Sequence, residues 1–176
     1  INSLNLVKSR QEWITFNVLQ EYSRSGVFER IYLIDNLQIE QHLENVPVIG
    51  YYDKLNNMIV SLFHMMNVYD HIDSVIDTFS VPPQGCRIST IGFYDPNSSE
   101  NKLFFSLDNI KEIRYYYAIN KKKLETDSDI LKKVREQVEN KVKTSYGIFA
   151  TDYEEDYIYT VAHTSEIQRQ KSEKNT

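Results

Sequence analysis

The sequence contains one cysteine, Cys86, and a single cysteine cannot form a disulfide within the chain. The sequence also lacks a signal peptide and an uncharged apolar run long enough to cross a membrane. These absences argue against a disulfide-stapled secreted domain and against a membrane protein. We therefore expect a cytoplasmic chain without membrane contact.

Basic residues are outnumbered, because 20 lysines and arginines stand against 25 aspartates and glutamates, for a net charge of -5. Duplex DNA is bound by clustered lysine and arginine that displace counterions from phosphates, so direct DNA binding is not expected. The four histidines, at positions 42, 64, 71 and 163, show no ligand spacing with Cys86 or with paired carboxylates. We therefore expect no metal site.

The rest of the composition is ordinary for a globular protein. The 176 residues are 41% hydrophobic and 26% charged, without low-complexity blocks or internal repeats. This length predicts one packed unit with an attached piece. The chain begins at Ile1, without an initiator methionine, directly before an apparently helical stretch. We expect an excised or proteolysed piece of a longer protein.

Hydrophobic spacing in the first half predicts a helix, a strand and a long helix. Residues 6–23 place their apolar side chains on one helical face, which we expect to be buried. Residues 28–34 are rich in β-branched and aromatic residues and precede Asp35-Asn36, which predicts a strand and a turn. Residues 37–43 could add a helical turn. A second amphipathic helix follows Gly50, with its apolar stripe at Tyr52, Leu55, Ile59, Leu62, Met66 and Tyr69.

The second half begins with Pro82-Pro83, which predicts a loop because adjacent prolines exclude a regular helix. Its pattern predicts four strands and two helical pieces, namely strands at 87–94, 113–119, 146–150 and 157–163, a short helix near 106–110 and a helix capped by Asp127 or Ser128. We expect 121–123 and 152–156 to be solvated turns and the polar end beyond Ser165 to be a mobile tail. This order predicts an α/β fold with a mixed sheet.

Three short segments, in this order, carry a resemblance to a known family: YLIDN at 32–36, YDKLNN at 52–57 and VIDTFS at 75–80. They resemble a strand end, the start of the central helix and the filament-contact loop of tubulin/FtsZ superfamily GTPases. Function must rest on such residues, because fold order cannot give it. The likeness implies the last part of a Rossmann-like nucleotide-binding domain, joined by a long central helix to a tubulin-like carboxy-terminal domain.

The resemblance also implies boundaries. Residues 1–50 would be the last helix and strand of the nucleotide-binding domain, and 51–72 the central connecting helix. Residues 73–85 would form the inter-subunit catalytic loop, 86–164 the carboxy-terminal domain, and 165–176 the polar tail.

Within this family, Asn36, Tyr52 and Asn56 would form the guanine site. Tyr52 would stack on the base, while the amides of Asn36 and Asn56 would read its edge. Residues four apart lie on one helical face, so Tyr52 and Asn56 can address the same planar base. An amide offers the donor and the acceptor that guanine needs. The alternatives are a turn role for Asn36 and a core position for Tyr52.

The resemblance places Asp77 in a loop that touches the nucleotide of a neighbouring subunit and helps to position the attacking water. A loop-capping role is the alternative. Ser80 lies where the family often has a second, water-polarising acid. Either the alignment shifts to bring in Asp73, or hydrolysis is slow or differently arranged. The family's glycine-rich phosphate loop is missing from this sequence, so we do not expect the chain alone to hydrolyse GTP.

The short carboxy-terminal segment and the lack of glycine-rich runs favour the plasmid- and phage-encoded TubZ branch. This implies a full-length protein that binds GTP or GDP with Mg²⁺, assembles into filaments and segregates plasmid or phage DNA. The tail at 165–176 would contact a DNA-bound adaptor. The alternative is a non-hydrolysing tubulin-like scaffold or binding protein. A glycine-rich phosphate loop upstream in the same reading frame would favour the GTPase.

Overall fold

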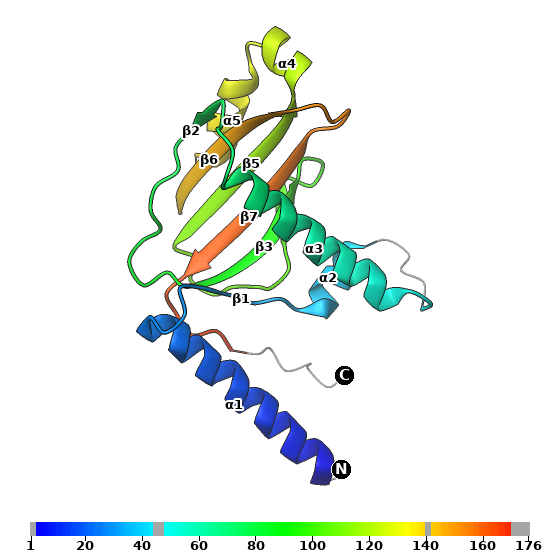
Figure 1. Ribbon diagram of the computed structural model, residues 1–176, viewed down its shortest axis with the longest axis vertical. Helices are drawn as coiled ribbons and strands as arrows, with labels where there is room; N and C mark the ends of the chain where they lie inside the picture. Colours follow the sequence, from blue (N-terminus) through cyan, green and yellow to red (C-terminus); the bar gives the residue numbers. More distant parts are fainter. Residues whose placement is uncertain (1–2, 44–47, 140–141, 170–176) are drawn as a thin grey trace.

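A mixed seven-stranded sheet organises the chain in the computed structural model, which describes residues 3–43, 48–139 and 142–169 (Figure 1). The helices are α1 (Ser3–Ser25), α2 (Asn36–His42), α3 (Tyr51–Tyr69), α4 (Lys121–Thr126) and α5 (Ile130–Val138). The strands are β1 (Ile31–Tyr32), β2 (Ile76–Asp77), β3 (Ile88–Asp95), β4 (Glu100–Leu103), β5 (Glu112–Asn120), β6 (Lys143–Thr151) and β7 (Tyr157–Thr164). The α/β class and the mixed sheet predicted from the sequence are thus confirmed.

The strands follow the order β1-β3-β7-β5-β6-β2, and β4 pairs with β3 beside this path. β7 lies between β3 and β5 and is antiparallel to both. β5 and β6 are parallel, and the chain between them passes through α4 and α5 because parallel neighbours need a crossover connection. β1 is parallel to β3 and β2 antiparallel to β6. The two short strands β1 and β2 therefore lie at opposite ends of this strand order.

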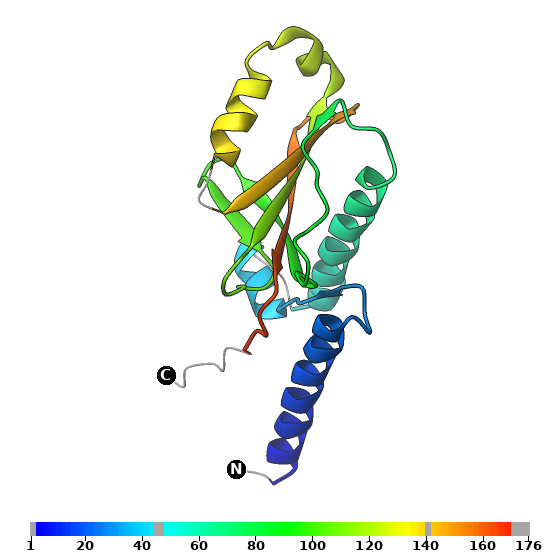
Figure 2. The ribbon, with the colours of Figure 1, turned by 90° about the vertical axis from the view of Figure 1, so that its left-hand side faces the viewer.

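Alternation along the strands gives the sheet two buried faces. In β5, Ile113, Tyr115 and Tyr117 belong to one apolar cluster, which also contains Val134 of α5. Tyr116 and Ala118 belong to the other, which contains the buried stripe of α3. Figure 2 shows α3 on one side of the sheet and α5 on the other.

Helix α3 was predicted from its stripe, and Leu55, Leu62, Met66 and Tyr69 are its buried residues. It begins after Gly50, which has a φ of 80°, a backbone conformation that glycine adopts without strain. The helix thus covers one sheet face along its length. Tyr52 departs from the predicted stripe, because 68% of this residue is exposed.

Helix α1 extends away from the sheet (Figures 1 and 2), and its predicted buried face is largely wrong. Exposed fractions are 58% for Val7, 59% for Trp13 and 48% for Tyr22. The physical reason is that its contacts with the other described residues lie in its second half. There Phe16 packs beside Phe105, and Gln20 and Ser23 are fully buried.

The expected helix near 106–110 is not formed, because this segment is a loop bound to the end of β7 and to the chain that follows it. The amide of Asp108 donates to Oε1 of Gln168 at 2.6 Å, and Thr164 Oγ1 donates to the carbonyl of Asn109 at 3.0 Å. Residues 121–123, expected to be a turn, begin helix α4, whose cap Asn120 accepts from the amide of Lys122. The cap of α5 is Asp129, one residue beyond the predicted pair.

The expected mobile tail is also partly wrong. Gln168 is 1% exposed and Ile167 packs against the core, so this part of the segment is held in place. The rest of the tail, 170–176, lies outside the described residues. The division at residues 50, 72 and 85 remains a prediction. The hydrogen bonds between β1 and β3 join residues from the first and fourth predicted parts into one sheet.

Candidate functional site

The three residues predicted to read guanine lie on α2 and α3, which Figure 1 shows beside each other. Asn36 is the first residue of α2, and Tyr52 and Asn56 are one turn apart near the start of α3. All three are exposed. The ring of Tyr52 meets Tyr51 edge-to-face, with centroids 5.1 Å apart. Its outer surface is therefore available to a planar group.

Local hydrogen bonds fix the two helices that carry these residues. Asp35 caps α2 by accepting from the amide of Leu37 at 3.0 Å, and its own amide donates to the carbonyl of Phe104 at 2.7 Å. The Tyr51 hydroxyl donates to Glu40 at 2.9 Å and so ties α3 to α2. This bond to a carboxylate raises the pKa of Tyr51. The predicted Asp35-Asn36 turn therefore serves as a helix start.

Asp77 lies past the opposite end of α3, in the edge strand β2, and its side chain is exposed. The Ser74 hydroxyl donates to Asp77 Oδ2, and the amide of Phe79 donates to Oδ1 at 3.3 Å. The carboxylate therefore caps its own loop, as the alternative interpretation predicted. Its exposure still leaves it open to an outside group.

A cavity of about 550 Å³ lies beside Asp77. Its lining comprises Tyr69, Asp70, Ile72, Asp73, Ser74, Asp77, Phe79, Arg114 and Phe149. Asp70 is held by the Tyr116 hydroxyl at 2.9 Å, whereas Asp73, the alternative acid, is exposed at the same cavity. Arg114, on strand β5, lines the same cavity, and its Nη2 donates to the carbonyl of Ser80.

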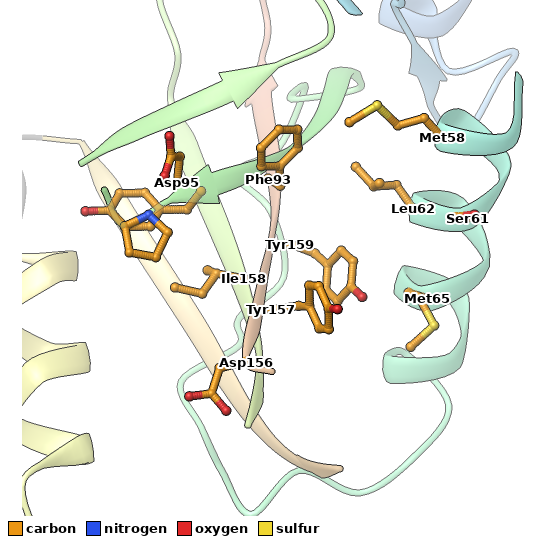
Figure 3. A pocket seen from close by; sticks show the side chains of 12 residues that line it. Met58, Ser61, Leu62, Met65, Phe93, Asp95, Asp156, Tyr157, Ile158 and Tyr159 are labelled. Carbon is orange, nitrogen blue, oxygen red and sulfur yellow. The ribbon is translucent and has the colours of Figure 1, made fainter. Parts of the chain in front are cut away.

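A second cavity, of about 440 Å³, lies between α3 and the ends of β3 and β7, and sequence reasoning missed it. Figure 3 shows Phe93, Tyr157 and Tyr159 pointing toward α3, where Met58, Leu62 and Met65 line the opposite wall. The signal was present as methionines seven residues apart on one helix and as alternating tyrosines on β7. A face that lines a cavity and a face that packs in the core show the same spacing of apolar residues. The sequence alone therefore could not distinguish them.

The two carboxylates near this second cavity, Asp95 and Asp156, accept hydrogen bonds from neighbouring residues of the fold. Asp95 accepts from the amide of Asn97 and from the hydroxyl of Ser98, each at 2.9 Å, and these bonds lower the pKa of Asp95. Asp156 accepts from the amide of Asn120 at 3.1 Å and from Lys123 at 2.8 Å. The cavity is therefore apolar in character.

No group of three or more histidine, cysteine or acidic side chains with metal-binding geometry occurs among the described residues. The five glycines stand apart in the sequence, at positions 26, 50, 85, 92 and 147. Backbone amides of a glycine-rich loop are what cradle phosphates in such sites. The described residues therefore provide neither a glycine-rich phosphate cradle nor a metal-binding group.

Within the described ranges, no helix combines the length and apolarity that a membrane crossing requires.

No protein-family model and no curated protein sequence matches this chain. Solved structures do match in fold. One is TubZ-Bt in a helical model of its four-stranded filament, with 17% identity, a TM-score of 0.59, and coverage of 88% of this chain and 49% of that one.

A second is an FtsZ dimer from M. jannaschii, with 12% identity, a TM-score of 0.52, and coverage of 81% of this chain and 50% of that one. The chain thus spans about half the length of the solved chains it matches. Over most of its length, it is structurally similar to part of TubZ and FtsZ, members of the tubulin/FtsZ family.

Proposed function

We propose that this chain is part of a filament-forming, tubulin-like GTPase of the TubZ type, which segregates plasmid or phage DNA. The observation that carries the proposal is the likeness in fold to TubZ-Bt, which covers 88% of the chain. The three family-like segments fall on the connection from the end of β1 to the start of α2, the start of α3 and the loop around β2. The relative itself is seen in a four-stranded filament.

The separation of the two candidate sites supports an arrangement between subunits. Helix α3 has 19 residues, and a helix rises about 1.5 Å per residue, so its ends lie about 28 Å apart. Asn36, Tyr52 and Asn56 lie toward one end, and Asp77 follows the other. A carboxylate at that distance would serve a nucleotide bound to the next subunit of a filament.

The proposal requires GTP or GDP and Mg²⁺ to be held partly outside this sequence. Tyr52 and the two asparagines would bind and orient the base, while phosphate and metal contacts would come from other parts of the full-length protein. Bound nucleotide would supply the phosphoanhydride bond that is hydrolysed. The part contributed by this chain to a neighbouring site would be the water-orienting carboxylate of Asp77.

The proposed contact with a DNA-bound adaptor concerns the end of the tail. Gln168 is engaged by α1 and by the loop at Asp108, so it is not free to bind a partner. The adaptor contact would therefore involve residues 170–176.

A non-hydrolysing scaffold is the second candidate, and the surroundings of Ser80 favour it. At the position where the family often has a second acid, the carbonyl of Ser80 accepts from Arg114. A guanidinium group there does not polarise water as a carboxylate would. This arrangement suits a protein that keeps the tubulin-like shape without turnover.

Substitution of Asp77 in the full-length protein separates the two candidates. Asp77→Ala should leave GTP binding nearly intact, while polymer-dependent turnover falls by roughly 10²–10⁴-fold, the span for a lost general base. Filaments should persist longer. The measurement is phosphate release together with light scattering, at matched concentration above the assembly threshold.

Two further variants make this test specific. Asp152→Ala removes an exposed acid from another loop and should turn over at the parental rate. Asp73→Ala tests the alternative alignment. Parental turnover by Asp77→Ala within filaments would show that Asp77 only caps its loop.

A further inference from the structure

The loop that carries Asp77 is fixed to the sheet by its backbone. The amide of Val75 donates to the carbonyl of Ile148 at 2.7 Å, and the amide of Thr78 donates to that of Tyr146 at 2.8 Å. The amide of Tyr146 donates in return to Thr78 Oγ1 at 3.0 Å. These bonds hold the two ends of β2 against β6. The exposed Asp77 carboxylate is held by the Ser74 hydroxyl before it and by the amide of Phe79 after it.

The Phe79 ring packs against Gly147, where the absence of a side chain leaves room for it. A Cβ at Gly147 would lie 2.5 Å from Cε2 of the Phe79 ring, so a larger residue there would displace the ring. The ring also packs on Tyr116, with centroids 5.0 Å apart. Because Phe79 donates its amide to Asp77, the position of this ring affects that of the carboxylate.

Arg114 contacts the same loop through its guanidinium group. Its guanidinium carbon lies 5.7 Å from the centroid of the Phe79 ring, and its Nη2 donates to the carbonyl of Ser80. Its Nε lies 3.4 Å from the carboxylate of Glu112, which is completely buried. The side chain of Arg114 is itself only 14% exposed. A planar guanidinium can make these contacts together, whereas a lysine ammonium lacks the fork and the stacking face.

We propose that Arg114 is a positioning residue for Asp77. Anchored on Glu112, it clamps Phe79 and Ser80 and so fixes the direction in which the Asp77 carboxylate leaves the sheet edge. This inference rests on the proposed role of Asp77 at the nucleotide of a neighbouring subunit. A water-orienting group must be held close to its productive geometry, and residues locked by packing supply that restraint.

Amide hydrogen exchange of this chain tests the clamp without any nucleotide. Arg114→Lys keeps a positive charge near Glu112, and Phe79→Leu removes the stacked ring while leaving Arg114 in place. Both should speed exchange at Val75 and Thr78 by about tenfold, because opening of the loop becomes easier. Exchange in β7 should not change. The matched control is Arg87→Lys, which alters an arginine whose Nη1 donates to the carbonyl of Phe28 instead.

Turnover in the full-length protein then tests the consequence for Asp77. Arg114→Lys should lower kcat in filaments by about tenfold with KM unchanged, since the base site on α2 and α3 is untouched. Unchanged exchange at Val75 and Thr78 in the folded variants would overturn the clamp.

The remaining outcomes separate this inference from the proposed function. If Arg114→Lys loosens the loop but turns over at the parental rate while Asp77→Ala is slow, the positioning role is wrong. If Asp77→Ala also keeps the parental rate, the proposed function fails, and the positioning role fails with it.

Discussion

His163 is the penultimate residue of the internal strand β7 and has no exposed surface. Its Nδ1 is 2.7 Å from the hydroxyl of Ser89 on β3, and its cross-strand neighbour on β5 is the buried Glu112. Neither Nε2 of His163 nor Oε2 of Glu112 has a hydrogen-bond partner within the described part of the chain. Ser89, His163 and Glu112 therefore form a row of buried polar side chains across three neighbouring strands.

This burial makes the stability of the fold depend on pH. Desolvation, with Arg30 and Arg114 nearby, lowers the pKa of His163 from 6.5 to about 3. The unfolded chain therefore binds the proton more tightly, so stability falls as the pH drops below about 6.5. Between pH 7 and pH 5, we expect a loss of about 2 kcal/mol from this residue.

Urea unfolding at several pH values measures this loss. His163→Gln cannot titrate and should show a smaller decrease over the same range. Equal pH dependence in the two proteins would mean that His163 is not the group responsible.

At the scale of elements, α1 is joined to the end of the described chain by two glutamines. Gln20 Oε1 accepts from the amide of Gln168 at 2.7 Å, and Gln20 Nε2 donates to the carbonyl of Gln168 at 3.1 Å. The side chain of Gln168 bonds in turn to both backbone groups of Asp108. Helix α1, the loop at Asp108 and the chain after β7 thus meet at the buried side chains of Gln20 and Gln168.

Gln168→Ala should therefore destabilise the chain more than an ordinary surface change. It removes two partly buried hydrogen bonds to the backbone of Asp108, each worth about 0.5–1.5 kcal/mol. Gln84→Ala, at an exposed loop position, should cost less than about 0.5 kcal/mol. Thermal unfolding of the three proteins gives the comparison, and similar midpoints for both variants would contradict a structural role for Gln168.

The longer elements could be predicted because local pattern and burial agree in them. In α3, β3, β5 and β7 the spacing of apolar residues matches the face that packs. The exceptions depend on distant partners. The short strand β2 needs β6, and β4 is polar in sequence and pairs with β3 at Gly92, where a Cβ would lie 2.2 Å from the carbonyl of Lys102.

The candidate site shows the same division. The sequence could place Tyr52 and Asn56 one turn apart on one helix, because helix spacing alone decides that. Asn36 was predicted in a turn at a strand end, whereas it begins α2. The sequence could not place Arg114 beside Phe79 and Ser80, because this contact joins residues 34 positions apart across the sheet. Nor could it show that the apolar residues of α1 would be exposed.

For the molecule as a whole, the proposed base site is not accompanied by a glycine-rich loop that would bind the phosphates. We expect the isolated chain to bind GTP with a dissociation constant weaker than about 1 μM, which corresponds to about -8 kcal/mol. Phosphate contacts supply much of the charge-assisted binding of a nucleotide, and the scattered glycines do not offer them. Isothermal calorimetry with GTP, and with ATP as the control, is the measurement. Tighter binding of GTP would place the phosphate site within these 176 residues.

The hydrogen bonds between Gln20 and Gln168 also determine which element would first bear a pulling force on the end of the chain. A cargo that pulled on the chain beyond Arg169 would strain the hydrogen bonds between Gln168 and Gln20 before it reached β7. The tension would pass to α1, the helix that stands away from the sheet. β7, which is paired on both sides, would then be shielded from being peeled away strand by strand.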